Sequence, residues 1–284
     1  MQTFLDCIPC ICRQALDAAR FATDDEAIHA QVLRRALAAA GEMDMQMSPP
    51  AMAQQMHRMI GELTGARDPY AAIKAHSNQY ALEMYPELSR RIAASDDPLA
   101  AGVRMAIAGN IIDFGATSSV EDATIASHIE AAWSAPLLGN SVDDLRAAVA
   151  GAGDILYLGD NAGEIVFDRM LIEQLPAERI TYVVKAAPVI NDATRADAEQ
   201  AGLIDMVNVI DNGSDAPGTL LDTCSDAFRR RFAEADLVIS KGQGNYESLS
   251  DSVGDIFFLL KVKCRVIARD LGCEMGSLML KRSS

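Results

Sequence analysis

The chain has 284 residues and a mass of 30.5 kDa, carries a formal net charge of −15, and is half hydrophobic. A chain of this length and composition buries a substantial core, as one large domain or two small ones. The acidic balance is spread over both halves without a basic patch, which excludes nucleic acid as an expected partner. No apolar run reaches membrane-spanning length, and the N-terminus lacks a signal-peptide pattern. The sequence therefore predicts a cytoplasmic protein without membrane contact, and it leaves the oligomeric state open.

Cysteine usage agrees with a reducing compartment. Three of the six cysteines crowd into residues 7–12, which makes a poor disulfide framework. The pair Cys7-x-x-Cys10 stands at a probable helix start and admits three interpretations. It is a pair of buried structural thiols, half of a metal site completed in space by Cys264 or Cys273, or a redox-active pair.

Residues 1–150 carry the spacing of helices and predict an all-helical N-terminal part. Start signals precede three of these helices. Asp97 stands before Pro98, and a serine followed three residues later by an acid occurs at 118–121 and at 141–144. The predicted helices cover Glu26–Ala40, Ala51–Leu63, Pro69–Met84, 98–109, Asp122–Trp133 and 142–151.

In residues 151–284 the sequence pattern differs, because short β-rich runs alternate with helical ones. This alternation is typical of an α/β domain in which helices cover a mostly parallel sheet. The predicted strands are Ile155–Leu158, Ile180–Lys185, Met206–Ile210, Leu237–Ser240 and Arg265–Ala268. The predicted helices between them are Ile165–Leu175, Ala193–Ala201 and Asp222–Ala235.

The stretch Asp154–Glu164, with the sequence DILYLGDNAGE, reads as a strand, a tight turn and a helix start. Backbone N–H groups and the positive helix end at such a turn favour an anion. The side chains of Asp160, Asn161 and Glu164 favour a hard cation at the same point. A phosphate bound to a metal ion satisfies both preferences.

Polar loops follow each of the first four predicted strands, and in a parallel sheet their carboxyl ends share one edge. Asp160, Asn161 and Asp192 are all oxygen ligands, which suit Mg²⁺ or Mn²⁺. Lys241, next to glycines that allow close backbone approach, can hold a phosphoryl group as a point charge. The alternative is structural: the Asp and Asn residues are helix caps, and Lys241 is a solvated loop lysine.

Several other site types are excluded by the residues present. All four histidines lie in the helical part, so the sheet part by itself holds neither a histidine-rich zinc site nor a Ser-His-Asp triad. The dinucleotide-binding glycine fingerprint does not follow the first strand, and no Walker A pattern exists. The remaining chemistry is that of an oxygen-ligated cation beside a phosphate.

Five motifs in order resemble the damage-control phosphatase family, the ARMT-like domain, in its prokaryotic branch with an N-terminal C-x-x-C. They cover essentially the whole chain. The motifs are Cys7-x-x-Cys10, GNIID at 109–113, GDNAGE at 159–164, PVIND at 188–192 and KGQGNYE at 241–247.

The resemblance implies a helical N-terminal part on a Rossmann-like sheet, and divalent-metal-dependent hydrolysis of phosphate monoesters. It implies one Mn²⁺, Mg²⁺, Co²⁺ or Ni²⁺ ion held by Asp160, Asn161 and Asp192. Asp160 and Lys241 are then the candidate catalytic residues, with the nucleophile left open between a metal-bound water and Asp160. The implied phosphate- or substrate-binding residues are Asn110, Asp113, Ala162, Gly163, Glu164, Asn191 and Lys241.

The sequence thus predicts a phosphatase acting on a small phosphorylated metabolite, such as a sugar phosphate or a damaged metabolite. Two other classes stay open. A methyltransferase using S-adenosylmethionine fits a Rossmann-like sheet but lacks the glycine-rich first loop. A non-catalytic module that binds a metabolite or a metal is the third hypothesis. Neither the physiological substrate nor the preferred metal follows from the sequence.

Overall fold

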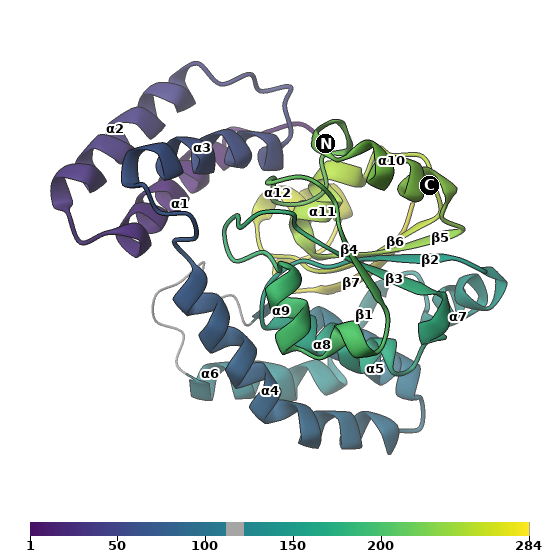
Figure 1. Ribbon diagram of the computed structural model, residues 1–284. Coiled ribbons are helices and arrows are strands. Elements are labelled where there is room, and N and C mark those ends of the chain that lie inside the picture. Colours follow the sequence, from purple (N-terminus) through teal and green to yellow (C-terminus); the bar gives the residue numbers. More distant parts are fainter. Residues whose placement is uncertain (112–121, 284) are drawn as a thin grey trace.

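The computed structural model describes residues 1–111 and 122–283, and a seven-stranded sheet forms its centre (Figure 1). The strand order is β1-β7-β6-β5-β2-β3-β4, and every neighbouring pair is parallel except the antiparallel pair β6–β7. The predicted α/β class with a mostly parallel sheet is therefore confirmed. The strands are β1 (Leu137–Gly139), β2 (Ile155–Leu158), β3 (Ile180–Val184), β4 (Asn208–Asp211), β5 (Leu237–Lys241), β6 (Ile256–Lys261) and β7 (Leu278–Arg282).

Helices cover both faces of the sheet and form a separate group at one end. One face carries α4 (Ala71–Ala93), α5 (Pro98–Ala108), α6 (Asp122–Ser134), α7 (Val142–Gly151), α8 (Glu164–Ile172) and α9 (Arg195–Gln200). The other face carries α10 (Asp226–Glu234), α11 (Gly242–Leu249) and α12 (Arg265–Leu271). The 3-10 turns are η1 (Gly109–Ile111), η2 (Ala177–Arg179), η3 (Leu203–Asp205) and η4 (Leu221–Thr223).

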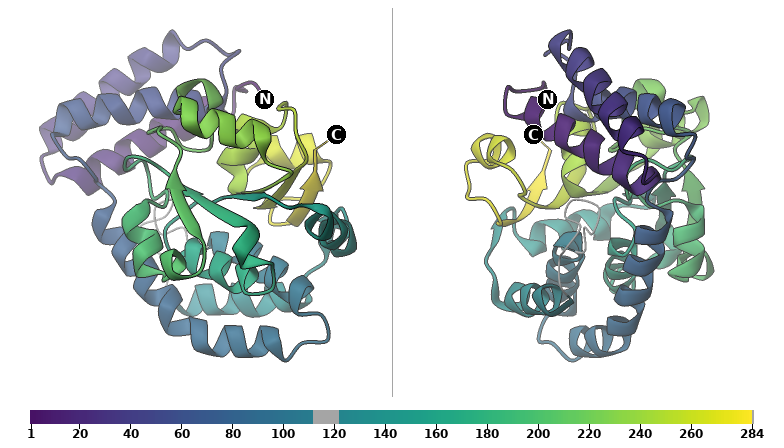
Figure 2. Two further views of the ribbon diagram at one scale, coloured as in Figure 1. Left: turned by 45° about the vertical axis from the view of Figure 1, so that its right-hand side comes forward. Right: turned by 90° about the vertical axis from the view of Figure 1, so that its left-hand side faces the viewer.

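The separate group consists of α1 (Cys7–Ala22), α2 (Glu26–Gly41) and α3 (Pro49–Thr64). These helices bury their own small core around Ile11, Val32 and Met52. Figure 2 shows them stacked beside the layered part, and α3 contacts α11 there. In the described part of the chain, no helix has the length and apolar character needed to span a bilayer.

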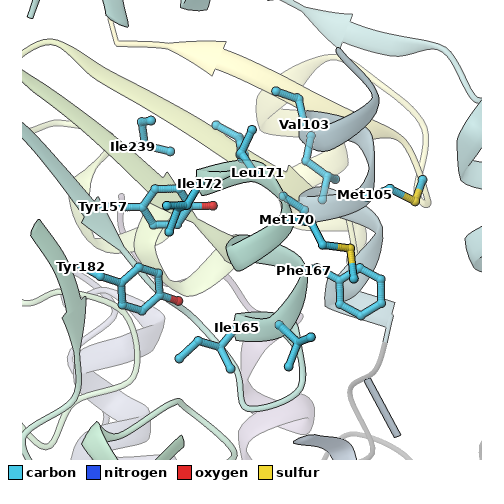
Figure 3. Close-up of a cluster of buried hydrophobic side chains, with 14 of the residues drawn as sticks. Val103, Met105, Tyr157, Ile165, Phe167, Met170, Leu171, Ile172, Tyr182 and Ile239 are labelled. Carbon is cyan, nitrogen blue, oxygen red and sulfur yellow. The ribbon is translucent and has the colours of Figure 1, made fainter. Parts of the chain in front are cut away.

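The central strand and the helix that follows it form the middle of the core. All four residues of β2 are buried, as expected of a parallel strand covered on both faces. Helix α8 is buried nearly all round because it lies between the sheet and the outer helices α4 and α5. Figure 3 shows Tyr157 and Tyr182 of the sheet on one side of α8, and Phe167 and Met170 of α8 on the other side, toward Met105 of α5.

The sheet has its topological switch point between β2 and β5. From β2 the chain builds β3 and β4 on one side, then returns to place β5 on the other side of β2. The helices that follow these two strands, α8 and α11, therefore lie on opposite faces. Ligands in such sheets bind in the crevice at the carboxyl ends of the two strands.

Most predicted elements are present, and the errors concentrate near the C-terminus. The predicted strand Arg265–Ala268 is wrong, because these residues begin α12. Strands β6 and β7 were not predicted, and part of the predicted loop after Lys241 is the first turn of α11. The capping pattern at 118–121 lies outside the described residues.

The N-terminal part is helical as predicted, with one exception. Strand β1 lies before residue 150, yet it pairs with β7 and joins the sheet. One hydrophobic core also joins α4 and α5 to the sheet. The division into residues 1–150 and 151–284 stays a prediction, and the packing ties the two parts together.

The capping box predicted before α7 is present and gives a test of local stability. The amide of Asp144 donates to Ser141 Oγ (3.1 Å), and the amide of Ser141 donates to Asp144 Oδ2 (2.9 Å). We expect Ser141→Ala to lower the free energy of unfolding by about 1 kcal/mol, because an orphan helix amide loses its acceptor. Urea denaturation measures this change. Ala147→Ser, exposed in the same helix, is the control and should cost at most about 0.5 kcal/mol; equal losses would contradict the cap.

Candidate active site

The loops that leave β2 and β3 lie against each other at the carboxyl edge of the sheet. Asn161 and Asp192 form an isolated antiparallel bridge, and the amide of Ala193 donates to the carbonyl oxygen of Asp160 (2.7 Å). The side chains of Asp160, Asn161 and Asp192 therefore start from adjacent backbone. The structure brings together the three residues that the sequence groups as oxygen ligands.

Two carboxamides bridge the same two carboxylates beside this junction. Asn110 Nδ2 donates to Asp160 Oδ2 (3.0 Å) and to Glu164 Oε2 (2.5 Å). Asn161 Nδ2 donates to the same two oxygens at 2.9 and 3.2 Å. All four side chains are buried, and none of these bonds uses Asp160 Oδ1. Among the described residues the amide oxygen of Asn110 has no donor.

Lys241 is a buried counter-ion and not an open phosphate contact. Its ammonium group donates to Glu164 Oε1 (2.6 Å), Asp168 Oδ1 (2.6 Å) and the carbonyl oxygen of Ala106 (2.8 Å). An ammonium group has three donors, so the protein uses all of them. The side chain has no exposed surface. The predicted open contact of Lys241 with phosphate is not seen in this arrangement, and its role in phosphate binding or catalysis stays a prediction.

A further layer of hydrogen bonds fixes Asp168. The hydroxyl groups of Tyr157 and Tyr182 donate to Asp168 Oδ1 (2.8 Å) and Oδ2 (2.7 Å). Burial, together with this carboxylate, raises the pKa of both phenols well above the ordinary value, so they stay hydrogen-bond donors. Burial alone would lower the pKa of Lys241, but Asp168 and Glu164 outweigh it and raise that pKa. Lys241 therefore keeps its positive charge at neutral pH.

Gly242 lets α11 approach the site closely. Its φ is +79°, and an added Cβ would lie 1.8 Å from Asp160 Oδ2. Only a residue without a side chain fits this conformation and this distance. Glycine is therefore required at position 242 for the start of α11 to pack against Asp160.

The two amides predicted to bind phosphate are used within the protein. The amide of Ala162 donates to the carbonyl oxygen of Asn191 (2.8 Å), and the amide of Gly163 donates to Asn78 Oδ1 (2.6 Å). Asn78 of α4 also donates to Asp197 Oδ1 (2.9 Å), just after the second site loop. Ala162, Gly163 and the backbone of Asn191 thus hold the loops in place, and their assignment as phosphate- or substrate-binding residues stays a prediction.

Lys263 is a cation near the site that the sequence analysis missed. It lies in the loop after β6, and its backbone amide donates to Gln243 Oε1 (3.2 Å). Its side chain is exposed, and its charge opposes the rise that burial causes in the pKa of Asp160. The strand that places it was not predicted. Asp113, the remaining predicted contact, lies outside the described residues.

Negative charge is in excess at this buried edge. Burial, then the charges of Glu164 and Asp192, raises the pKa of Asp160 well above its ordinary value. When all four are ionised, four buried carboxylates face two buried ammonium groups, which leaves two negative charges for a bound cation to balance. Oxygen donors with this excess fit one divalent cation such as Mg²⁺ or Mn²⁺. The carboxylates are those of Asp160, Glu164, Asp168 and Asp192, and the ammonium groups are those of Lys185 and Lys241.

The cysteine pair shows no sign of redox activation. Cys7 and Cys10 lie one turn apart at the start of α1, and all six cysteines are free. Burial raises the pKa of both thiols, and the nearby Cys264 adds to the effect, so the reactive thiolate is suppressed. Within the described ranges, no three His, Cys, Asp or Glu side chains are grouped to hold a metal. Cys7 is half-buried and Cys10 is exposed, so the pair is not the buried pair of structural thiols that was one of the interpretations of the sequence.

A groove of about 440 Å³ lies far from these loops, at the amino ends of β2, β3 and β4. Its walls include Asp154, Thr181 and Asn208. The guanidinium group of Arg231 in this groove is paired with Asp154 (2.5 Å from Nη2 to Oδ1). The groove holds none of the predicted site residues and lies at the edge opposite to the ligand-binding crevice.

The burial of Lys241 gives a prediction that separates a role as buried counter-ion from a role as phosphate contact. We expect Lys241→Met to lower the free energy of unfolding by about 3–5 kcal/mol, because two buried carboxylates lose their shared cation. Urea denaturation measures the loss. Lys263→Met is the control, and this exposed change should stay within about 0.5 kcal/mol. A stable Lys241→Met protein with only a raised KM would restore the phosphate-contact role.

Comparisons with known proteins agree with the resemblance seen in the sequence. The family profile of the damage-control phosphatase ARMT1-like domain matches residues 3–279. A damage-control phosphatase of Archaeoglobus fulgidus is 34% identical over 281 residues, covering 97% of both chains. Damage-control phosphatase PH1575 of Pyrococcus horikoshii is 33% identical over 289 residues, covering 100% of this chain and 99% of that protein.

The fold agrees as well. A crystal structure of a DUF89 family protein from Pyrococcus horikoshii superposes with a TM-score of 0.90 at 30% identity and covers all of both chains. Similarity of sequence and of fold thus extends over the whole chain. The protein belongs to the damage-control phosphatase family defined by the ARMT1-like domain.

Proposed function

We propose that the protein is a divalent-metal-dependent phosphatase acting on small phosphate monoesters, such as sugar phosphates or damaged phosphorylated metabolites. The observation that carries the proposal is the convergence of Asp160, Asn161 and Asp192 at the carboxyl edge of the sheet, on the loops after β2 and β3. Two relatives bear the name damage-control phosphatase, which supports the reaction class. The excess of two buried negative charges supports the need for a cation.

Asp160, Asn161 and Asp192 would hold the metal ion, with oxygen atoms as ligands. When bound, a divalent ion supplies positive charge for the phosphoryl oxygens and makes a water molecule more acidic. Asn110 and Asn161 both donate to Asp160 Oδ2, which holds this carboxylate in one orientation. A carboxylate held in this way suits a ligand better than a nucleophile, and this favours water as the attacking group.

Two lysines shape the approach of the phosphate. Lys185 Nζ lies 3.5 Å from Asp192 Oδ2 and forms an ion pair with that carboxylate. Lys263 is exposed at the mouth of the site and is within electrostatic reach of Asp160. A cation in this position attracts a phosphate dianion toward the crevice. Lys263 therefore replaces Lys241 as the proposed phosphate contact.

The test is hydrolysis of an aryl phosphate by purified protein with Mn²⁺, Co²⁺, Ni²⁺ or Mg²⁺. We expect Asp160→Ala and Asp192→Ala to lower kcat by more than about 100-fold, because a ligand should matter more than the 10–100-fold typical of its supporting residues. Both variants should also lose Mn²⁺ binding in calorimetry. A panel of sugar phosphates then identifies the preferred substrate class.

Asp211→Ala is the matched control. Asp211 also ends a strand of the same sheet, but its carboxylate caps the local turn at Gly213 (2.9 Å) and lies on an exposed surface. This variant should keep both turnover and metal binding. Full turnover by Asp192→Ala, or no metal-stimulated hydrolysis by the wild-type protein, would contradict the proposed function.

A further inference from the structure

Glu164 is placed where it decides which atom of a neighbouring carboxamide faces the proposed metal. Its Oε2 accepts from Asn161 Nδ2 and from Asn110 Nδ2, and both amides also donate to Asp160 Oδ2. An ionised carboxylate only accepts hydrogen bonds. The NH₂ groups of Asn110 and Asn161 must therefore face these two carboxylates, and their carbonyl oxygens must face away.

The carbonyl oxygen is the atom of a carboxamide that binds Mg²⁺ or Mn²⁺. Because Asp160 and Glu164 both accept from the NH₂ group of Asn161, its carbonyl oxygen is turned away from these two carboxylates before any ligand arrives. A flipped carboxamide would turn two donors toward the cation. Supporting residues that orient a ligand in this way are a general feature of metal sites.

Lys241 explains why Glu164 can do this without exposure to water. Glu164 has no exposed surface, and Lys241 Nζ lies 2.6 Å from its Oε1. This ion pair occupies one carboxylate oxygen and leaves the other for the two carboxamides. Lys241 is in turn held by Asp168, which contacts neither Asn110 nor Asn161.

We propose that Glu164 is a positioning residue that fixes the orientation of Asn161 and Asn110, with Lys241 as its counter-ion. This role replaces the substrate contact that the sequence predicted for Glu164. It rests on the proposed metal-dependent function. The carboxamide oxygen of Asn161 serves the metal, and that of Asn110 is buried without a donor among the described residues.

Three variants separate orientation from charge. Glu164→Gln removes a negative charge and also the acceptor-only character of the side chain. Glu164→Asp keeps the charge but withdraws the carboxylate from the two carboxamides. Asp168→Asn removes a negative charge beside Lys241 and leaves the contacts of Glu164 with the two carboxamides in place. Mn²⁺ affinity measured by calorimetry or electron paramagnetic resonance is the main readout.

We expect Glu164→Gln and Glu164→Asp to weaken Mn²⁺ binding about 10–100-fold, the range found for residues that orient ligands. Asp168→Asn should weaken it less than either. At saturating Mn²⁺ the Glu164 variants should keep the wild-type KM for an aryl phosphate, because Glu164 does not contact the substrate. Thermal unfolding confirms that each variant is folded, and Glu164→Asp, which keeps the ion pair, provides the comparison if Glu164→Gln does not fold.

Wild-type Mn²⁺ affinity in Glu164→Asp would overturn the inference, because charge alone would then suffice. Equal losses in Glu164→Gln and Asp168→Asn would overturn it for the same reason. A KM that stays raised at saturating metal would return Glu164 to the role of substrate contact. A wild-type protein that binds no Mn²⁺ would overturn the proposed function and the inference together, which distinguishes that failure from the others.

Discussion

The buried ammonium group of Lys241 is the interaction on which the rest of the site depends. A buried charge costs several kcal/mol to remove from water, so it is stable only with partners of good geometry. Its partners Glu164 and Asp168 lie four residues apart, on one face of α8. Its third partner, Ala106, belongs to α5. One lysine at the end of β5 therefore fixes the start of α8, and with it the loop that carries Asp160 and Asn161.

The helices of the first 150 residues contribute side chains to the candidate site. Asn110, just after α5, bridges the two carboxylates, and Asn78 of α4 accepts from the amide of Gly163. Lys74, one turn before Asn78, lies 3.3 Å from Asp197 Oδ2, beside the loop that carries Asp192. Helix α4 thus contacts the loop that carries Asp160 and also α9, which follows the loop that carries Asp192, although α4 carries none of the predicted ligands.

The sequence could predict the edge of the sheet but not the direction of each side chain. Asp160 and Asp192 follow buried apolar runs, and the rule that carboxyl ends of parallel strands share an edge brings them together without coordinates. The motif placed Lys241 in an open loop, whereas it is the buried last residue of β5. Side chains alternate along a strand, so Lys241 shares the face of Ile239, which packs under α8. That alternation was readable in the sequence.

Other features required tertiary contacts that no local pattern reveals. The engagement of the Gly163 amide by Asn78 joins residues 85 positions apart. Strand β6 has the sequence IFFLLK, which is itself typical of a buried strand. The strand was instead predicted at 265–268 because of the β-branched residues there, but these residues begin α12. Because β6 was not predicted, Lys263 was not recognised as a site residue. Its position at the carboxyl edge of the sheet depends on the strand before it.

Lys185, Lys241 and Lys263 at this edge differ in how deeply they are buried. The difference decides which carboxylate charges the protein itself neutralises before a ligand binds. Lys241 is fully buried and Lys185 nearly so, and both are committed to carboxylates; Lys263 is exposed. Their combined charge still leaves the buried edge negative, on a chain whose net charge is −15. A phosphate dianion is repelled by such a surface until a cation is present. Under the proposed function the metal ion must therefore bind first, since it converts a repulsive crevice into an attractive one.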